Sequence, residues 1–219
     1  MGKRIFDLVL GTLLLLVALP LILVFAVALA VTLRAWPFFV QERIGQHGRP
    51  FRMFKLRTLP SGTPRYALKS TLGLESLPAL PRMLRKSHLD ELPQLFSVVA
   101  GTLSLVGPRP KMPDHCEPAP AEYVAVRQSI QQGCTGLWQI GRHADGLPHE
   151  APEYDYFYLR NRTVRLDAWI LWTTVRMTLG LTEGVDLESV PEWALVADSA
   201  PVPRLAGTPE PAAVVASAA

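Results

Sequence analysis

Two adjacent acids, Asp90 and Glu91, stand in a charged block of the sequence, with Arg85 before them and Arg109 after them. A carboxylate can ligate Mg²⁺, a hard cation that takes oxygen ligands and keeps substrate phosphates in its shell. It can also attack phosphorus as a nucleophile, provided that cationic groups offset the repulsion between like charges. Arginine suits this task because its planar guanidinium engages phosphate oxygens in two places. The pattern therefore predicts chemistry on a phosphorylated substrate.

Each of these residues also has an ordinary structural explanation. Acids in a first helical turn are stabilised by the helix dipole, and basic residues before them are common on surfaces. Lys55 and Arg57 alternate along a predicted strand, which is typical of a solvated strand face or a membrane-surface patch. Asp155, between two tyrosines, is typical of a hydrogen-bonded loop acid, with catalysis as the alternative. The residues alone leave these interpretations open.

The acid pair depends on a helix predicted within the block of residues 83–101, with its N-cap at Ser87. Ser87 precedes Asp90 by three residues, which is an N-cap signature, and apolar residues follow at helical spacing. Pro93 is tolerated because it falls in the first turn of this helix. Gly101 ends the apolar run as a C-terminal cap. The acids are therefore expected at a helix start.

Other local patterns position the basic residues. Prolines on both sides of Arg109 predict a stiff turn that fixes its backbone. Residues 37–57 predict two extended pieces around a glycine-containing turn, with Lys55 on the second piece. Helices are predicted over residues 122–131 and 165–181. The second carries tryptophans beside basic residues, which suits a membrane interface or packing against the body.

Charge is distributed unevenly along the 219 residues, of which 49% are hydrophobic. Residues 182–219 hold six acids and one base, a net charge of −5, which leaves +8 on residues 1–181. A basic body suggests an anionic partner such as nucleic acid, a membrane surface or a phosphorylated substrate. The Ala- and Pro-rich end lacks periodicity and predicts a disordered tail. Two cysteines exclude a disulfide framework and favour a reducing compartment.

The N-terminal segment is long enough for the hydrocarbon core of a bilayer, because 26 residues from Leu8 to Leu33 carry no charge. Lys3 and Arg4 precede it and Arg34 follows, so both flanks favour the cytoplasm. Pro20 lies mid-run and removes a backbone donor. Two arms of about twelve residues could therefore enter and leave one leaflet as a re-entrant hairpin.

Two alternatives exist for this segment. A secretory signal is suggested by the basic start and by Ala28-Leu29-Ala30, although the apolar run exceeds a usual signal core. A helix that spans the bilayer and only bends at Pro20 is the other, because neighbouring groups can satisfy the freed backbone. Sequence physics alone does not separate the span from the hairpin.

Several blocks taken together resemble one family, the bacterial sugar transferases, which are monotopic polyprenyl-phosphate phosphoglycosyl transferases, here of the small type with only the catalytic core. The resemblance covers residues 1–181 in order. The most specific blocks are Leu-Asp-Glu-Leu-Pro-Gln at 89–94 and Val-Gly-Pro-Arg-Pro at 106–110. Shorter ones are Lys-Arg-Ile-Phe-Asp at 3–7, Arg-Ile-Gly at 43–45, Phe-Lys-Leu-Arg-Thr at 54–58 and Gly-Cys-Thr-Gly-Leu-Trp-Gln at 133–139.

This resemblance implies transfer of a sugar 1-phosphate from a UDP-sugar to polyprenyl (undecaprenyl) phosphate with release of UMP, the first membrane step of glycan assembly. Asp90 matches the nucleophile that forms a phosphosugar-aspartyl intermediate, near which Mg²⁺ would be held, and Glu91 matches its dyad partner. Arg85 and Arg109 match phosphate-contacting arginines, and Lys55 matches a basic position near the donor. Pro20 matches the proline that breaks the re-entrant helix.

Some residues depart from the family pattern. Leu19 stands where a serine often precedes the helix-breaking proline, Thr102 replaces an acid, and Ser97 replaces a common asparagine. The segment from Gln139 to Arg142 is one residue shorter than usual. Arg142 is nevertheless expected among the phosphate-binding residues of the donor pocket. None of these changes affects the acid pair or the turn around Arg109.

The expected protein is α+β and mostly α, with a re-entrant membrane helix over residues 1–36, a catalytic domain over 37–181 with a small β-hairpin and amphipathic interfacial helices, and a disordered tail over 182–219. It would act at the cytoplasmic face of the bacterial inner membrane. Expected partners are a UDP-sugar, polyprenyl phosphate and membrane lipids, without nucleic acid, and a homodimer is left open. The alternative is a membrane-tethered, non-catalytic scaffold or anionic-ligand-binding protein.

Overall fold

The computed structural model describes residues 2–64, 76–113, 118–144 and 146–196. Most of its regular structure is helical, as expected, with two small sheets. The helices are α1 (Gly2–Leu33), α2 (Ala79–Lys86), α3 (Gln94–Ala100), α4 (Ala121–Gln128), α5 (Leu137–Ile140), α6 (Pro152–Arg160) and α7 (Val164–Thr178). The strands are β1 (Phe38–Ile44), β2 (Pro50–Leu56), β3 (Ser104–Val106) and β4 (Gly133–Thr135), and short 3₁₀ turns include η1 (Gln46–Gly48), η4 (Leu89–Glu91), η5 (Pro148–Glu150), η6 (Leu187–Ser189) and η7 (Glu192–Ala194).

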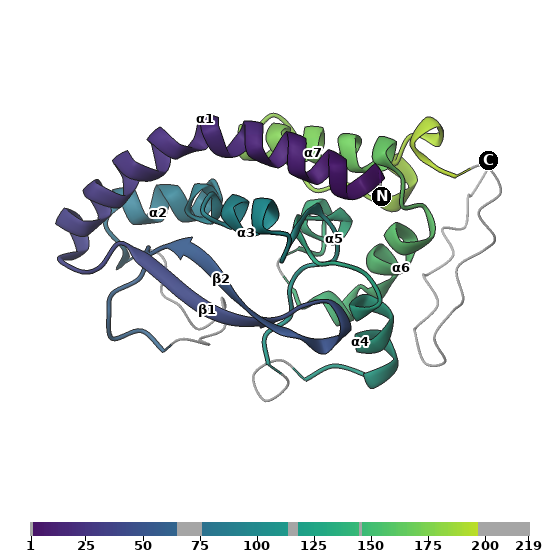
Figure 1. The fold of residues 1–219 in the computed structure, drawn as a ribbon, viewed down its shortest axis with the longest axis horizontal. Helices are drawn as coiled ribbons and strands as arrows, with labels where there is room; N and C mark the ends of the chain where they lie inside the picture. Colours follow the sequence, from purple (N-terminus) through teal and green to yellow (C-terminus); the bar gives the residue numbers. More distant parts are fainter. Residues whose placement is uncertain (1, 65–75, 114–117, 145, 197–219) are drawn as a thin grey trace, which may run out of the picture.

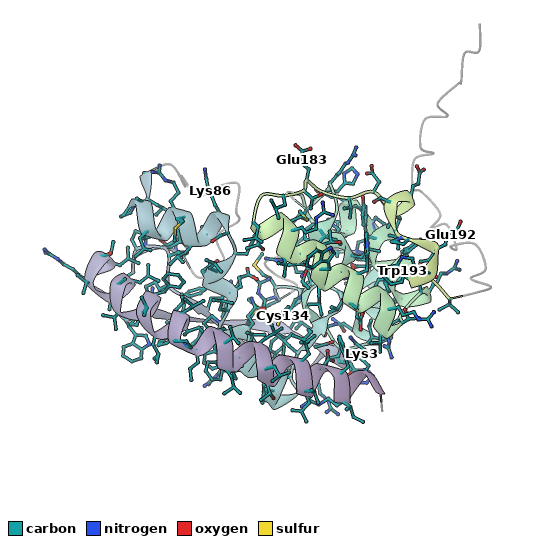
Figure 2. All side chains as sticks on the ribbon, turned by 90° about the horizontal axis from the view of Figure 1, so that it is seen from above. Lys3, Lys86, Cys134, Glu183, Glu192 and Trp193 are labelled. Atoms are coloured by element: carbon teal, nitrogen blue, oxygen red, sulfur yellow. The ribbon has the colours of Figure 1, made fainter. Side chains whose placement is uncertain are left out.

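The elements are stacked in layers beneath α1 (Figure 1). Helix α1 curves along one edge of the molecule, with α7 beside it in the same layer (Figures 1 and 2). Helices α2 and α3 lie under α1, and the β1–β2 hairpin lies on the other side of them (Figure 1). Helices α4 and α6 occupy the opposite end of the molecule from α2.

Helix α1 is continuous from Gly2 to Leu33 and contains Pro20. The expected division into two arms, and with it the re-entrant hairpin, is therefore not confirmed. By length and composition this helix could cross a membrane. A proline inside a helix costs one hydrogen bond and bends the axis without having to end it.

The inner face of α1 forms part of the protein core. Ala18, Ile22, Ala26 and Leu29 are buried at helical spacing in a cluster with residues of β2 and α2 that includes Leu56 and Leu84. Gly11 lies so close to α3 that a Cβ atom there would stand 2.8 Å from Val98 Cγ1. The helix is thus packed on the body along its length.

Polar contacts fix the first turns of α1. The buried Asp7 carboxylate accepts hydrogen bonds from Ser104 Oγ at 2.8 Å and from the Leu105 amide at 3.1 Å. Lys3 Nζ lies 2.6 Å from Asp167 Oδ2 on α7. The Arg4 guanidinium donates to the carbonyls of Val98 and Val99 near the end of α3. The charged first turn of α1 is therefore attached both to α7 and to the end of α3.

The predicted hairpin is confirmed. Strands β1 and β2 pair antiparallel, with Phe38 opposite Leu56 and Phe39 opposite Lys55. The connecting turn places His47 and Gly48 at positive φ, which glycine adopts freely. Alternation in the sequence was sufficient for this element because its contacts are local.

The single helix predicted from an N-cap at Ser87 to Gly101 is wrong, because the structure has two separate elements there, η4 and α3. The chain leaves α2 after Lys86, and His88 adopts a left-handed conformation with φ of 56°. Ser87 Oγ donates to the Met83 carbonyl at 2.9 Å and caps no following helix. Leu92 and Pro93 both keep right-handed helical dihedrals, and α3 begins at Gln94, directly after Pro93. Asp90 and Glu91 consequently occupy a tight turn between two helices.

A second core lies beneath α7 and surrounds the short parallel pair of β3 and β4. Beside this pair, the segment that carries Gly107 crosses Gly133 and Gly136 at close range. A Cβ atom on Gly133 would stand 2.1 Å from the Gly107 nitrogen, and one on Gly136 would stand 2.1 Å from its oxygen. Only glycine permits this approach, which holds the turn around Arg109 against the core.

The expectation of a disordered tail from residue 182 is wrong for residues 182–196. Val190 and Ala194 are buried in the second core. The Val185 amide donates to the Ile140 carbonyl at 2.8 Å, and Thr163 Oγ1 donates to the Ala194 carbonyl at 2.9 Å. A few separated apolar residues hold this segment, and such anchors produce no periodicity. Residues 197–219 of the predicted tail lie outside the described residues.

Helix α7 confirms the helix predicted near the end of the body, with an exposed apolar face. Trp172 is 62% exposed and Leu179 is 65% exposed, and Val164 and Val175 lie on the same side of the helix. Helix α7 lies beside α1 in the same layer (Figures 1 and 2), and both helices carry exposed apolar side chains.

Candidate active site

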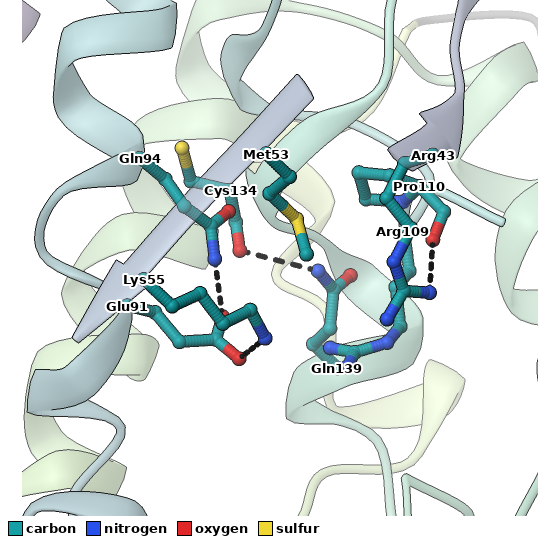
Figure 3. Close-up of a pocket in the computed structure, with 9 residues that line it drawn as sticks. All are labelled: Arg43, Met53, Lys55, Glu91, Gln94, Arg109, Pro110, Cys134 and Gln139. Atoms are coloured by element: carbon teal, nitrogen blue, oxygen red, sulfur yellow. Dashed lines mark hydrogen bonds and ion pairs between the residues drawn. The ribbon is translucent and has the colours of Figure 1, made fainter. Parts of the chain in front are cut away.

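A narrow cavity lies where β2, η4, the turn around Arg109 and β4 converge. Lys55 and Glu91 lie on one side of it and Arg109 on the other (Figure 3). The remaining lining residues are Arg43, Met53, Gln94, Pro110, Cys134 and Gln139. The structure thus brings together Lys55, Glu91 and Arg109, of which the first and last are 54 positions apart in the sequence.

Glu91 forms a tight ion pair with Lys55. Lys55 Nζ lies 2.5 Å from Glu91 Oε1, and Gln94 Nε2 donates to Glu91 Oε2 at 2.8 Å, so both carboxylate oxygens are engaged. Burial acts to raise the pKa of Glu91, but the Lys55 and Arg109 charges outweigh it and hold this pKa well below its usual range. Burial lowers the pKa of Lys55, against the opposing charge of Glu91. Glu91 is therefore an ionised group that holds Lys55 in place.

Asp90 is only 5% exposed, and it accepts no hydrogen bond or ion pair from another side chain in the described part of the protein. Burial raises the pKa of Asp90 to about 6, and the Glu91 charge acts in the same direction, while Lys55 and Arg85 counteract them. At neutral pH this carboxylate is mostly ionised but is not held in an ion pair. Such a group can act as a nucleophile or as a metal ligand.

The predicted arginines differ in their positions. Arg109 lines the cavity, and its charge contributes to the low pKa of Glu91. Arg85 lies on the Asp90 side, where its guanidinium donates to Thr58 Oγ1 at 3.3 Å and its charge acts on Asp90. Cationic side chains therefore flank the acid pair, as phosphate chemistry requires.

Each of the four consecutive backbone carbonyl groups in the turn around Arg109 accepts a hydrogen bond. Pro108 accepts from the Gly133 amide at 3.0 Å, and Lys111 accepts from the Ile44 amide at 2.9 Å. The two carbonyls between them, of Arg109 and Pro110, accept from the guanidinium groups of Arg127 at 2.7 Å and Arg43 at 3.1 Å. The stiff turn predicted from its prolines is thus fixed by four donors from three elements, β1, β4 and α4.

Two residues considered from the sequence lie away from the cavity. Arg142 is not among the lining residues. Its guanidinium is 67% exposed and lies 3.1 Å from Asp186 Oδ2, so its assignment to the donor pocket stays a prediction. Asp155 is buried beside Arg127 and accepts a hydrogen bond from Tyr123 at 2.6 Å, as expected for a hydrogen-bonded acid, but it lies in helix α6 and not in a loop.

Sequence reasoning missed Arg43, Gln94 and Gln139 as parts of the site. Arg43 is buried in β1, where it also donates to Gln41 Oε1 at 2.7 Å. Gln94 stands three residues after Glu91, and this spacing could have suggested it. All three lie inside the blocks that carry the family resemblance, but no local pattern shows which residues of a block face a cavity.

The donor set fits Mg²⁺ only as an ion that the substrate helps to bind. Within the described ranges, no three acidic, histidine or cysteine side chains gather as a metal site. Asp90 offers one carboxylate that is free of an ion pair, whereas Glu91 is engaged by Lys55 and Gln94. Mg²⁺ commonly uses one or two carboxylates and completes its shell with water and substrate phosphates. Asp90 is therefore the residue that would hold it.

Comparison with known proteins identifies the family of the chain. A sequence model of the family described as bacterial sugar transferase matches residues 1–180. The uncharacterized sugar transferase EpsL of Bacillus subtilis is 39% identical over 84% of this chain and 89% of its own length.

Two further relatives are longer proteins. The UDP-glucose:undecaprenyl-phosphate glucose-1-phosphate transferase of Klebsiella pneumoniae is 32% identical over 79% of this chain and 39% of its own length. The undecaprenyl-phosphate galactose phosphotransferase of Salmonella typhimurium is 32% identical over 81% of this chain and 40% of its own length. This chain thus spans about two fifths of the length of these two relatives. The family match over residues 1–180 spans the acid pair and the Arg109 turn. The chain belongs to the bacterial sugar transferase family of enzymes.

Proposed function

We propose that the protein transfers a sugar 1-phosphate from a UDP-sugar to undecaprenyl phosphate through a covalent intermediate on Asp90. The observation that carries this proposal is a buried, mostly ionised Asp90 next to the Lys55–Glu91 pair, with Arg85 and Arg109 nearby. The names of the Klebsiella and Salmonella relatives support the acceptor and the type of reaction. Those names differ in the sugar, so the donor is proposed only as a UDP-hexose.

In the first step, an Asp90 oxygen attacks the donor phosphorus that carries the sugar. The bond between this phosphorus and the bridging oxygen of the diphosphate breaks, and UMP leaves with the electron pair. In the second step, a phosphate oxygen of undecaprenyl phosphate attacks the same phosphorus, and the bond to Asp90 breaks. The product is undecaprenyl diphosphate-linked sugar, and Asp90 is regenerated as a carboxylate.

The surrounding residues make the approach of two anions feasible. Arg109 and Lys55 face the cavity and are placed to neutralise phosphate oxygens, and Arg85 acts from the Asp90 side. Glu91 orients the Lys55 ammonium through their 2.5 Å contact. Mg²⁺, when bound at Asp90 and the donor diphosphate, would supply further positive charge.

Both ends of α1 contact the same body, which supports monotopic insertion. Asp7 is bonded to Ser104 near the start of the helix, and Leu29 packs with Leu56 near its end. A helix that crossed the bilayer would have to leave this body. The exposed apolar faces of α1 and α7 would instead lie in one leaflet, and the basic residues at both flanks favour the cytoplasmic side.

The proposed function is tested by UMP release from nanodisc-embedded protein with Mg²⁺, undecaprenyl phosphate and a panel of UDP-hexoses. The wild-type chain should release UMP with at least one donor, and Asp90→Asn should lower the rate by at least about 1,000-fold. Glu42→Gln, which removes an exposed acid on β1, should have no effect. Absence of UMP from folded, inserted protein across the panel would refute the proposal.

The covalent step has its own test. Protein incubated with the productive donor and no acceptor should gain the mass of a sugar phosphate, located on the peptide that contains Asp90. Glu42→Gln should gain the same mass, and Asp90→Asn should not. UMP release without any adduct would contradict the aspartyl intermediate while leaving the overall transfer intact.

A further inference from the structure

A buried ion pair outside the cavity joins α4 to α6. Arg127 Nε lies 2.7 Å from Asp155 Oδ2, and the two side chains are only 5% and 3% exposed. The Tyr123 hydroxyl donates to the same Asp155 oxygen at 2.6 Å, and the Arg127 guanidinium carbon lies 5.1 Å from the Tyr123 ring centroid. These contacts give the Arg127 guanidinium one defined orientation.

The free end of this guanidinium reaches the candidate active site. Arg127 Nη2 donates to the backbone carbonyl of Arg109 at 2.7 Å. Because Arg109 stands between Pro108 and Pro110, its carbonyl belongs to no helix or strand that would otherwise satisfy it. Holding the carbonyl fixes the peptide plane that follows Arg109, and so restricts the direction in which the Arg109 side chain leaves the backbone.

Stability alone is a weak reason for such a pair. Replacing a buried ion pair with apolar residues of similar volume is often neutral or stabilising, because the cost of removing two charges from water offsets their attraction. Precise placement of a charged group at a reacting centre has a larger effect, since a displacement of about 1 Å can cost about 100-fold in rate.

We infer that Arg127, oriented by Asp155, is a positioning residue for Arg109, and that this pair sets the reach of the Arg109 guanidinium toward the donor phosphates. The inference rests on the proposed function for its kinetic consequence, but its structural half is independent of turnover. Asp155 also makes the arrangement electrically neutral, so Arg127 holds the turn without adding a second net charge behind Arg109.

The structural half is tested by hydrogen exchange, followed by mass spectrometry, in the peptide covering residues 105–113 of the full chain. Arg127→Lys keeps the charge beside Asp155 but loses the planar fork that reaches two acceptors at once. It should raise exchange at the Arg109 and Lys111 amides at least about tenfold, as should Asp155→Asn. Arg52→Met, a change at an exposed arginine on β2, should not. Unchanged exchange in the Arg127 and Asp155 variants would overturn the inference, whether or not the protein forms UMP.

The kinetic half is tested by a double-mutant cycle with Arg109→Ala. Arg127→Lys should lower kcat/KM for UMP formation by about 10-fold to about 100-fold in the wild-type background and have no further effect once Arg109 is absent. Equal losses in both backgrounds would show a merely structural role and overturn the inference. Thermal unfolding of each variant verifies folding. A wild-type chain that releases no UMP would refute the proposed function alone, because hydrogen exchange would still decide whether Arg127 holds the turn.

Discussion

Lys55 on β2 and Glu91 in η4 form an ion pair of 2.5 Å that joins the hairpin to the turn between α2 and α3. Because Glu91 is held ionised by this pair, Asp90 is the member of the acid pair whose charge changes near neutral pH. The two neighbouring carboxylates thus differ in pKa because their surroundings differ. Glu91 serves as a fixed counter-charge, and Asp90 is left available for reaction.

Breaking the Lys55–Glu91 pair from one side should destabilise the protein. Lys55→Met leaves a mostly buried carboxylate without its cation, so we expect the free energy of unfolding to fall by about 3 kcal/mol. Adding Glu91→Gln removes the uncompensated charge and should restore part of this loss without restoring UMP release. Denaturant unfolding followed by tryptophan fluorescence measures both. A double variant no more stable than Lys55→Met would contradict the pairing.

The rate should depend on pH through Asp90. Its pKa is raised to about 6, and only the ionised carboxylate can attack phosphorus, so kcat/KM should rise with pH through this value and be about tenfold lower at pH 5 than at pH 7. Arg85→Gln removes a positive charge that lowers this pKa, so the acid limb of the profile should move to higher pH. A profile that is flat between pH 5 and pH 8 would exclude Asp90 as the titrating group.

Asp7 should be essential for the attachment of α1. Asp7→Ala leaves the buried Leu105 amide and Ser104 hydroxyl without their acceptor and should lower the free energy of unfolding by about 3 kcal/mol. Asp7→Asn retains one acceptor oxygen and should lose less. Leu8→Ala, a change at the neighbouring exposed position, serves as the control in thermal unfolding. Equal stability of Asp7→Ala and Leu8→Ala would show that the contact contributes nothing.

The two ends of α1 should lie on the same side of the membrane. Single cysteines introduced by Gly2→Cys and Trp36→Cys, in a chain whose own cysteines are replaced, should both react with a membrane-impermeant maleimide in inverted vesicles and not in intact cells. The physical reason is that both ends pack near the same body. Labelling of one position from each side would establish a span across the bilayer.

Elements set by local patterns were predicted well from the sequence. The hairpin follows from alternation and glycine placement, and Gly101 ends α3 at a positive φ of 85° as expected. The turn around Arg109 follows from its two prolines. In each case the deciding interactions lie within a few residues of one another, so the sequence shows them directly.

Features that depend on distant contacts were missed. The N-cap pattern of Ser87 and Asp90 is a common helix signal, but the left-handed His88 interrupts the helix there, so the acids lie in the turn η4. The ion pair of Arg127 and Asp155 joins α4 to α6, and no sequence pattern around either residue indicates the other as its partner. Segment 182–196 is held by single apolar residues such as Val190, which no periodicity reveals.

The shared core of α1 and the body has a consequence for how this protein can be divided. Ala18, Ile22, Ala26 and Leu29 complete an interior whose other half comes from β2 and α2. A truncated chain that begins after Leu33 would expose the apolar residues of β2 and α2 that α1 covers. A chimaera in which an unrelated membrane anchor replaces α1 would still bind lipid but would lack the α1 half of this core. The exposed residues of α1 are available to lipid, whereas the buried ones pack against the protein. Cutting or exchanging the chain after Leu33 would therefore remove part of the protein core.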